Sequence, residues 1–345
     1  MRIVLDAMGS DTCPEPELIA SVEAVKLFGD PIYLVGPENI LKPKLEGMGA
    51  DLDLVKIIPA TDVITMEDKG LQLALKVKRN AQTSMAVGVE LIKKKEADAF
   101  VTAGNTGGAL ATGFFRLGTI PGVELPGLTA LFPTRKGFCV VLDIGANPEC
   151  KPENLVQFAL MGAIYSRKVR QVQNPRIGLL SNGEEAGKGN DLVKKTYPLL
   201  QVSGLNFIGN VESKELFGGE ADVVVTDGFS GNILLKTSEA VGKLIVEVMK
   251  EQITSSPISK LGGLLAKSKL RAVSKIINPD EVGAVILLGL QGLVFVGHGR
   301  SNAHALVSAI HSARKTVEAD ILGEIQSTIQ QRLDESQNKL KEQEK

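Results

Sequence analysis

The chain has 345 residues, and its 39 Lys and Arg against 40 Asp and Glu give a formal net charge of −1. This balance excludes binding of nucleic acid through bulk positive charge, and 4% aromatic residues with no Trp leave few platforms on which bases could stack. Hydrophobic residues make up 43% of the chain, which excludes a wholly disordered protein. An odd number of cysteines without a CxxC pair is typical of a cytoplasmic protein rather than a disulfide framework.

One pattern recurs along the chain. A short apolar run ends in a cluster of Gly, Asn, Asp or Ser, and a helix-compatible segment follows, at residues 3–11, 99–108, 139–147, 177–185, 223–232 and 293–302. Plain strands are expected at residues 32–35, 55–58 and 206–208. This alternation predicts an α/β fold with a mostly parallel sheet covered by helices on both faces. We expect all six polar loops at one edge of the sheet, where ligands bind in such folds.

Two segments are additions to the predicted single catalytic domain, residues 1–316. Residues 253–278 form an expected basic amphipathic helical hairpin, hinged near Gly262 and Gly263. Its cations have no acid among them: Lys260, Lys267, Lys269, Arg271 and Lys275. An ordinary surface helix pair and a docking element for an anionic membrane or an acidic protein both remain open.

Residues 317–345 are expected to form a C-terminal helical extension with a frayed end. Apolar residues recur every four positions from Val317 to Leu333, which predicts a stripe that packs on the body or on a partner subunit. The longest apolar stretch, residues 282–297, is shorter than the ~20 residues that cross a bilayer, so we interpret it as buried core.

Several familiar catalytic motifs are missing from the sequence. There is no GxGxxG, HExxH or GxSxG, and Gly183–Gly189 resembles a P-loop that lacks its Ser or Thr. We therefore expect neither a metal site nor a cofactor. No motif ties a histidine to a cysteine, which disfavours a thiol nucleophile.

Glycine-rich loops suited to an oxyanion remain. Residues 103–108 open a helix, where backbone N–H groups and the helix dipole attract anions. Residues 181–190 add a cation, Lys188, between glycines. A lysine placed in this way supplies the charge that a bound phosphate needs.

At these loops the chain resembles the PlsX family of phosphate acyltransferases. The resemblance is carried by motifs in family order over residues 1–315: Asp6–Gly9, Gly104–Gly107, Ile120–Gly122, Asp143–Asn147, Ser181–Glu185, Lys188–Asn190, Asn206–Glu212, Asp227–Asn232 and Gly297–Gly299. Two departures stand out. Ser10 replaces a second glycine, and residues 281–285 replace a Tyr-Gly-Gly-Ala-Pro stretch.

The resemblance implies a three-layer α/β/α fold similar to that of phosphotransacetylases and decarboxylating dehydrogenases, and a homodimer. It implies that a fatty acyl group passes reversibly from acyl carrier protein to inorganic phosphate, giving acyl-phosphate for phospholipid synthesis. The family carries a protruding helical pair linked to membrane association where residues 253–278 lie. A cytoplasmic protein, peripheral at a membrane or bound to a membrane enzyme that uses acyl-phosphate, is expected.

Roles follow for the matching residues. Lys188 is the candidate that binds and orients phosphate, and Asn232 the candidate donor to the developing oxyanion. The other candidate binding residues are Gly104, Asn105, Thr106, Gly107, Ser181, Asn182, Asp143, Asn147, Asp227 and His298. Asp143, Asn147 and Asp227 are expected to shape their loops through side-chain hydrogen bonds, and a proton-handling role is open for Asp227 and His298.

Three other interpretations remain open. One is a phosphotransacylase that uses short acyl-CoA thioesters, and another is a non-catalytic acyl-carrier or membrane scaffold. A dehydrogenase is suggested only by the fold analogy, and the missing dinucleotide fingerprint argues against it.

Overall fold

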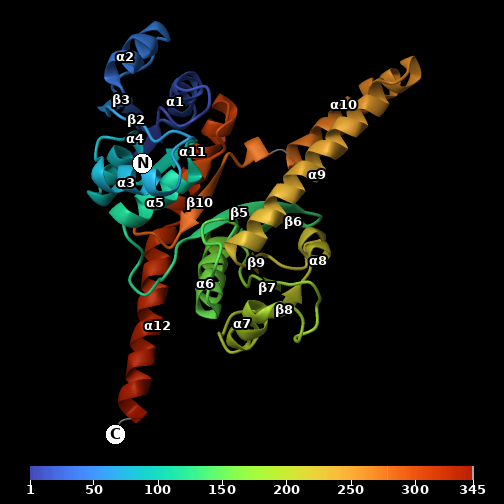
Figure 1. Cartoon of the computed structure of the whole chain (residues 1–345). Helices are drawn as coiled ribbons and strands as arrows, with labels where there is room; N and C mark the ends of the chain where they lie inside the picture. The colour runs from blue at the N-terminus through green and yellow to red at the C-terminus, as the bar shows by residue number, and fades with distance from the viewer. Residues whose placement is uncertain (278, 344–345) are drawn as a thin grey trace.

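Eleven strands form one continuous sheet in the order β3-β2-β1-β4-β11-β10-β5-β6-β9-β7-β8 (Figure 1). The computed structural model describes the backbone of residues 1–277 and 279–343, and the side chains of residues 1–270, 273 and 280–334. The strands are β1 (Ile3–Asp6), β2 (Ile32–Gly36), β3 (Val55–Pro59), β4 (Ala99–Thr102), β5 (Gly127–Thr134), β6 (Gly137–Leu142), β7 (Ile177–Leu180), β8 (Phe207–Val211), β9 (Val223–Val225), β10 (Ala284–Leu288) and β11 (Leu293–Gly297).

Helices connect most of the strands. They are α1 (Glu15–Phe28), α2 (Glu38–Gly47), α3 (Gly70–Arg79), α4 (Ser84–Lys93), α5 (Thr106–Arg116), α6 (Pro152–Lys168), α7 (Asp191–Gln201), α8 (Ser213–Gly218), α9 (Gly228–Thr254), α10 (Pro257–Ile277), α11 (Ala303–Glu318) and α12 (Ile321–Gln343). A short 3₁₀ turn, Pro279–Glu281, precedes β10.

The sheet is buried on both faces, which confirms the expected three-layer α/β/α arrangement. Successive residues of β1 enter different cores: Ile3 and Leu5 join one hydrophobic cluster, and Val4 joins the other. Strand side chains alternate between faces, so continuous apolar runs suit strands covered twice. Helices α1, α6, α11 and α12 pack on the first cluster, and α4 and α5 on the second.

The strand directions contradict the expectation of a single polar edge. β1, β2, β3, β4 and β11 run parallel, and so do β6, β7, β8 and β9. Between these groups, β10 and β5 pair antiparallel to their neighbours. The two groups therefore run in opposite directions, so their carboxyl ends leave opposite edges of the sheet. Apolar runs do not encode strand direction, which is why the sequence pattern did not reveal the reversal.

Two lobes result from this reversal. We call β1–β4, β11, α1–α5 and α11 the first lobe, and β6–β9 with α6–α8 the second lobe (Figure 1). The expected strands are all present. Strands β5 and β10 were missed: β10 lies in the apolar stretch interpreted only as core, and it pairs with β11 as an antiparallel hairpin.

The hairpin expected at residues 253–278 is longer than predicted, and its hinge lies elsewhere. Its arms are α9 and α10, joined at Ser255 and Ser256, while Gly262 and Gly263 lie inside α10. The pair projects away from the body (Figure 1). The side chains of Arg271 and Lys275 lie outside the described residues. Within the described part of the chain, no helix is long and apolar enough to cross a bilayer.

The apolar stripe of the C-terminal region packs on the body, one of the two expected outcomes. Ile321, Ile325 and Ile329 of α12 are at most 5% exposed. Gly122 approaches so closely that a Cβ there would lie 2.8 Å from Leu333. α11 ends at Glu318, slightly beyond the expected boundary at residue 316. The side chains of residues 335–345, where fraying was expected, are not among those described.

The first turn of α1 contains a buried acid that has no counter-ion among the described residues. Glu17 is fully buried, and its Oε1 accepts a hydrogen bond from the Ser10 amide at 2.9 Å. Its Oε2 has no partner among the described residues. Ser10, the departure from the family glycine, thus belongs to a turn held by Glu17. Burial raises the pKa of Glu17, and the nearby Asp6 adds to that rise.

Replacing Glu17 with glutamine should stabilise the protein, increasingly so at higher pH. A raised folded-state pKa gives stability that is fully present below the unfolded-state pKa and is lost as pH rises through the folded-state value. Urea unfolding of wild type, Glu17→Gln and the exposed control Glu23→Gln between about pH 5 and about pH 8 measures this. A gap between Glu17→Gln and wild type that stays constant with pH would contradict the assignment.

Candidate active site

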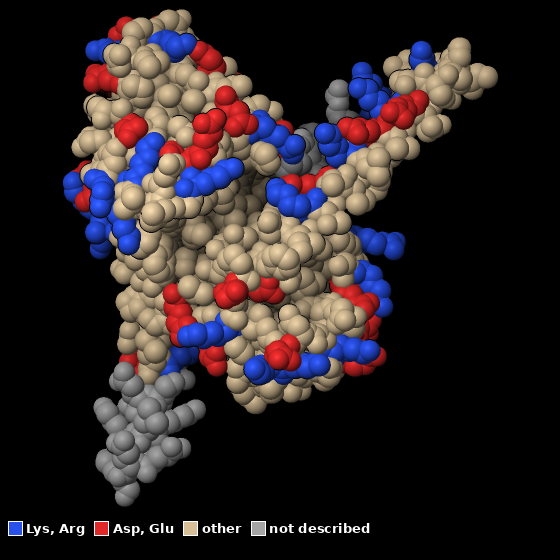
Figure 2. Space-filling model, in the orientation of Figure 1, with Lys and Arg blue, Asp and Glu red and all other residues tan. Residues whose placement is uncertain are grey.

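Figure 2 shows a hollow between the two lobes. Adjacent strands rotate by roughly 20–25°, so the four steps from β4 to β6 turn the strands by roughly 80–100°. Helix α9 begins between the two lobes and extends beyond them toward the upper right (Figure 1). His298, after β11, lies close enough to Lys236 and Glu239 of α9 for their charges to act on its imidazole. The two sets of loops therefore meet at α9.

In the first lobe, the loops after β1 and β4 lie against each other. A Cβ at Gly9 would lie 2.9 Å from the amide nitrogens of both Ala103 and Gly104, so only glycine allows this approach. Thr102 Oγ1 donates to Asp6 Oδ2 at 2.8 Å and accepts from the Gly104 amide at 3.0 Å. The Gly104 amide is thus already used in holding the loop.

Asn105 is the N-cap of α5. Its Oδ1 accepts from the Gly108 amide at 3.0 Å, and its Nδ2 donates to the carbonyls of Thr65 and Asp68, each at 2.9 Å. These bonds use the whole carboxamide. Thr106 and Gly107, the first residues of α5, are exposed, so their amides are the groups that this loop offers to an anion.

In the second lobe, Asp143 organises the loop after β6. Oδ1 accepts from the amides of Leu128, Gly145 and Ala146, and Oδ2 accepts from the amide and the Nδ2 of Asn147. The carboxyl group is fully buried, and that burial raises its pKa while the amide donors oppose the rise. The loop-shaping hydrogen bonds expected for Asp143 are present.

The start of α9 packs on this loop. Asp227 is its N-cap, with Oδ1 accepting from the Ser230 amide at 2.8 Å and Oδ2 from Ser230 Oγ at 2.9 Å. A Cβ at Gly231 would lie 1.9 Å from the Asp143 carbonyl oxygen, so the helix approaches the loop as closely as glycine permits. Asn232, one residue later, is exposed and contacts Gly145.

The loop after β7 presents a free cation. Asn182 Oδ1 accepts from the Gly189 amide at 3.0 Å and closes the loop. Lys188 is exposed, and among the described residues no carboxylate lies within ion-pair distance of its ammonium. Ser181 Oγ is buried and has no hydrogen-bond partner among the described residues. An unpaired cation and an unsatisfied hydroxyl both suit an anionic ligand.

The residues that the sequence grouped into one phosphate cradle follow strands of different lobes. Gly104–Gly107 follow β4 in the first lobe, whereas Ser181, Asn182 and Lys188 follow β7 in the second, and five strands stand between β4 and β7. None of the hydrogen bonds among the described residues joins these loops. Asn232 and Lys188 follow the neighbouring strands β9 and β7, so they share one edge.

His298 stands at the first-lobe side of the hollow. Its Nδ1 accepts from the Arg300 amide at 3.3 Å, which places the imidazole proton on Nε2. Burial lowers the pKa of His298, and the positive charges of Arg300 and Lys236 lower it further. The acids Glu239 and Asp11 raise this pKa, but by less. The ring is therefore a neutral hydrogen-bond donor at neutral pH.

Lys236, Glu239 and Arg300 were missed from sequence. Lys236 Nζ pairs with Glu239 Oε2 at 3.1 Å on α9. The signal was present, because Lys236 follows Asn232 by four residues and so shares its helix face. The sequence pattern does not indicate that α9 passes His298, because the two are far apart in the chain.

The cysteines are poor nucleophiles. Burial raises the pKa of Cys139 and of Cys150 to about 12 each, with nearby acids adding to both shifts. Burial also raises the pKa of the half-buried Cys13. Since the thiolate is the reactive form, these thiols do not supply one at neutral pH.

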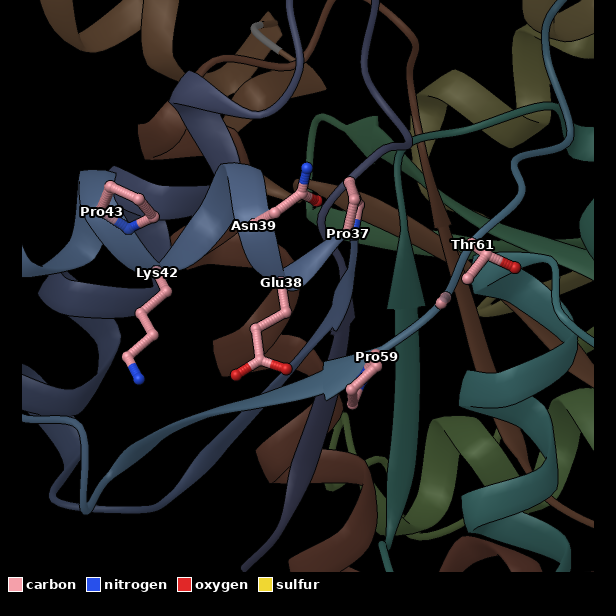
Figure 3. A pocket seen from close by; sticks show the side chains of 8 residues that line it. Pro37, Glu38, Asn39, Lys42, Pro43, Pro59 and Thr61 are labelled. Carbon is pink, nitrogen blue, oxygen red and sulfur yellow. The ribbon is translucent and has the colours of Figure 1, made fainter.

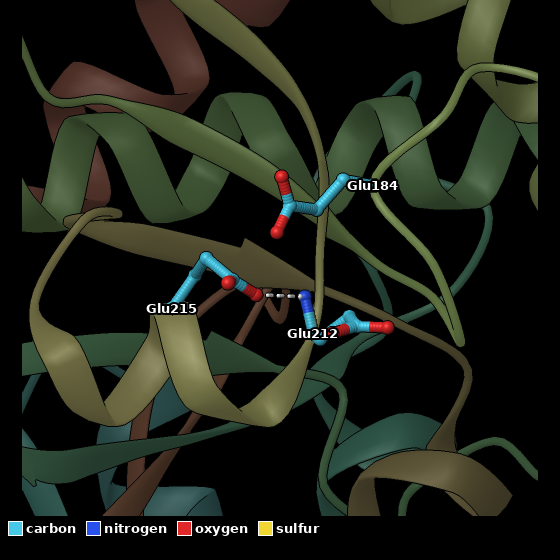
Figure 4. Close-up of side chains that lie close together, drawn as sticks. All are labelled: Glu184, Glu212 and Glu215. Atoms are coloured by element: carbon cyan, nitrogen blue, oxygen red, sulfur yellow. Dashed lines mark hydrogen bonds between the residues drawn. The ribbon is translucent and has the colours of Figure 1, made fainter.

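Two other features are a cavity of the first lobe and an acidic cluster of the second lobe that includes Glu184 of the loop after β7. A cavity of about 650 Å³ follows β2 and β3, lined by residues 37–39, 42, 43 and 59–61 (Figure 3). Its polar side chains point in different directions rather than converging, and none is a candidate site residue. Glu184, Glu212 and Glu215 cluster on the second lobe (Figure 4). The Lys214 ammonium lies 3.0 to 3.3 Å from all three carboxylates, so one positive charge offsets part of their negative charge.

The chain matches the family described as fatty acid synthesis protein over residues 1–323. It is 43% identical over 330 residues to a phosphate acyltransferase of Elusimicrobium minutum, covering 95% of this chain and 96% of that protein. It is also 43% identical over 321 residues to a phosphate acyltransferase of Acidobacterium capsulatum, covering 92% and 94%.

Solved structures share the fold at low sequence identity. The EutD phosphotransacetylase from Staphylococcus aureus aligns with a TM-score of 0.59 at 16% identity, over 92% of this chain and 94% of that one. A 4-hydroxythreonine-4-phosphate dehydrogenase from Klebsiella pneumoniae aligns with a TM-score of 0.52 at 16% identity, over 92% and 99%. The expected likeness to phosphotransacetylases and to a dehydrogenase fold is confirmed. With a family match that spans nearly its whole length, the chain belongs to the PlsX family of phosphate acyltransferases.

Proposed function

We propose that this enzyme transfers a fatty acyl group from acyl carrier protein to inorganic phosphate, giving acyl-phosphate for phospholipid synthesis and a free carrier thiol. The names of its relatives support phosphate as the acyl acceptor, and the family description supports a role in fatty acid metabolism. The observation that carries the proposal is the loop after β7, where the Lys188 ammonium is exposed and pairs with no described carboxylate, and where the Ser181 hydroxyl has no hydrogen-bond partner among the described residues.

Phosphate is itself the nucleophile, so the enzyme has to position it. Lys188 and Ser181 hold phosphate after β7, and one of its oxygens attacks the thioester carbonyl carbon. A C–O bond forms, and the carbonyl oxygen becomes an oxyanion that accepts from Asn232 Nδ2. The oxyanion then re-forms the carbonyl as the C–S bond breaks, and the sulfur takes up the proton that the attacking hydrogen phosphate brought, giving the carrier thiol. Holding the two reactants about 3–3.5 Å apart supplies much of the rate.

His298 completes the other wall of the hollow as a second donor. With Nδ1 occupied by the Arg300 amide, only Nε2–H is free to donate to phosphate or to the carbonyl oxygen. A neutral imidazole serves here as a donor rather than as a base.

Lys188→Ala and Asn232→Ala should each lower kcat by at least about 100-fold, as loss of one oxyanion donor does, without loss of folding. Acyl-phosphate formation from long-chain acyl carrier protein measures this, with Lys194→Ala, an exposed lysine of α7, as the matched control. Wild-type rates in either site variant would refute the assignment.

A short-chain acyl-CoA phosphotransacylase is the second candidate, favoured by the shared fold with phosphotransacetylases. In the same assay, acetyl-CoA replaces the acyl carrier substrate. We expect much higher kcat/KM on the carrier. A preference for acetyl-CoA would assign the enzyme to the second class. If neither thioester gives acyl-phosphate in the presence of phosphate, only the scaffold interpretation is left.

His298→Gln should retain most of the activity that His298→Ala loses, because the Gln carboxamide places an N–H near the position of Nε2. We expect about a 100-fold loss for Ala and less than about a tenfold loss for Gln. If both variants lose the same activity, His298 acts through proton transfer or through the shape of its ring, and not by donating a hydrogen bond.

We also propose that the enzyme is a homodimer and that the α9–α10 hairpin contacts an anionic membrane surface. It carries large exposed apolar side chains, with Ile258 and Leu265 at least 80% exposed. Lys260, Lys267 and Lys269 lie among them without an acid in α10. An apolar face with interspersed cations suits phospholipid headgroups. A membrane enzyme that consumes acyl-phosphate would then find its substrate at the same surface.

Leu264→Glu with Leu265→Glu should abolish sedimentation with vesicles of equimolar phosphatidylglycerol and phosphatidylcholine, while activity on dissolved substrate persists. The control pair, Leu27→Glu with Val202→Glu, changes equally exposed residues on the body. Unchanged vesicle binding in the hairpin variant would remove α10 from membrane contact.

A further inference from the structure

A second surface combines unpaired cations with exposed apolar side chains, and it lies beside the catalytic loops. It is formed by α3 and α5 and comprises Lys69, Leu71, Leu75, Lys78, Arg79 and Phe115; we call it the α3–α5 face. Leu71 is 75% exposed and Phe115 is 49% exposed. Figure 2 shows Lys and Arg gathered on this part of the first lobe, at the left.

The face keeps a positive charge after its ion pairs are made. Lys76 pairs with Asp68 at 3.0 Å and reaches Asp62 at 3.9 Å, so it balances acids of the preceding segment. Among the described residues, no carboxylate pairs with Lys69, Lys78 or Arg79. Lys78 Nζ lies 4.5 Å from the centre of the Phe115 ring, which joins a cation and an apolar surface at one point.

The face is fixed to the amino end of α5. Asn105, the N-cap of α5, donates to the carbonyls of Thr65 and Asp68, immediately before α3. Leu73 of α3 packs on Gly107, where a Cβ would lie 3.6 Å from Leu73 Cδ2. At the other end of α3, Arg116 donates to the carbonyls of Val77 and Asn80. A molecule seated on α3 is therefore held at a set position relative to the Gly104–Gly107 loop.

We propose that the α3–α5 face is the docking surface for the acidic protein that carries the acyl thioester. The proposal rests on the proposed function, since it names where the carrier of that substrate binds. A carrier rich in carboxylates complements Lys69, Lys78 and Arg79, and Leu71, Leu75 and Phe115 supply the apolar centre that protein interfaces have. Charged rims of this kind mainly accelerate encounter and set its salt dependence.

Other cations of the chain are less suited to carrier docking. Arg116 is engaged in holding α3, and Lys136 pairs with Glu220 at 2.8 Å. The cations of α10 lie on the hairpin that projects away from the body (Figure 1). A membrane could also meet a basic apolar surface, but the α3–α5 face adjoins the Gly104–Gly107 loop of the first lobe, one of the glycine-rich loops of the candidate site.

The test reverses the three cations together in Lys69→Glu, Lys78→Glu and Arg79→Glu. We expect KM for long-chain acyl carrier protein to rise at least about tenfold, with kcat kept and the salt dependence of kcat/KM largely lost. Turnover of an acyl-pantetheine thioester, which has no carrier protein, should not change. The matched control reverses three exposed, unpaired lysines of the same lobe, Lys26, Lys42 and Lys56.

Separate outcomes bear on the two proposals. If wild type forms no acyl-phosphate from the carrier substrate, the proposed function fails. If wild type is active and the triple variant keeps its KM, or if the control variant loses as much, the docking surface is wrong. Loss of vesicle sedimentation with an unchanged KM would assign the face to a membrane and likewise overturn the proposal.

A neutral substitution tests the apolar part without altering charge. Leu71→Ala should leave the urea midpoint of unfolding unchanged, because the side chain is mostly exposed. It should raise KM for the carrier substrate about threefold or more and leave the acyl-pantetheine reaction unaffected. If both Leu71→Ala and the triple charge-reversal variant keep the wild-type KM for the carrier substrate, the α3–α5 face is not the carrier-docking surface.

Discussion

The antiparallel pairing of β10, β5 and β6 at the centre of the sheet is the constraint on which the site depends. It reverses the direction of half the strands, and the right-handed twist of the sheet then turns the two sets of loops toward the space around α9. A sheet that stayed parallel throughout would place every loop along one edge. Here the loops form two walls instead, with Asn232 and Lys188 in one and His298 in the other.

Most polar side chains at these loops are committed to holding the backbone. The side-chain oxygens of Asn105, Asp143 and Asp227 all accept hydrogen bonds from nearby main-chain amides, and Asp143 and Asp227 accept from one side-chain donor each as well. Burial of a carboxylate is tolerated at Asp143 because several amides compensate its charge. Among the described residues, the groups that remain for a substrate are the exposed amides at the start of α5, the Lys188 ammonium, the Ser181 hydroxyl, the Asn232 carboxamide and the His298 imidazole. These groups suit a reaction in which one of the substrates, and not a side chain of the protein, is the nucleophile.

The chemistry matches the poor reactivity of the protein's own nucleophiles. Cys139 and Cys150 have raised pKa values, and phosphate needs no activation by a thiol or a base. The structure therefore supports catalysis by position and charge. In the same molecule, surfaces beside and away from the loops, the α3–α5 face and the α9–α10 hairpin, combine cations with exposed apolar residues. Their separation would let a carrier protein and a membrane bind without competing for one surface.

The order of elements, the helices that follow the polar loops and the family were readable from the sequence, because they depend on local patterns. Runs such as Val223–Val225 report burial on both faces, and Asn105 and Asp227 mark helix starts. Only the tertiary structure decided the strand directions, the turn at Ser255 rather than Gly262, and the approach of Lys236 to His298. These depend on contacts between residues far apart in the chain, and side-chain periodicity carries no record of which neighbour a strand pairs with or in which direction.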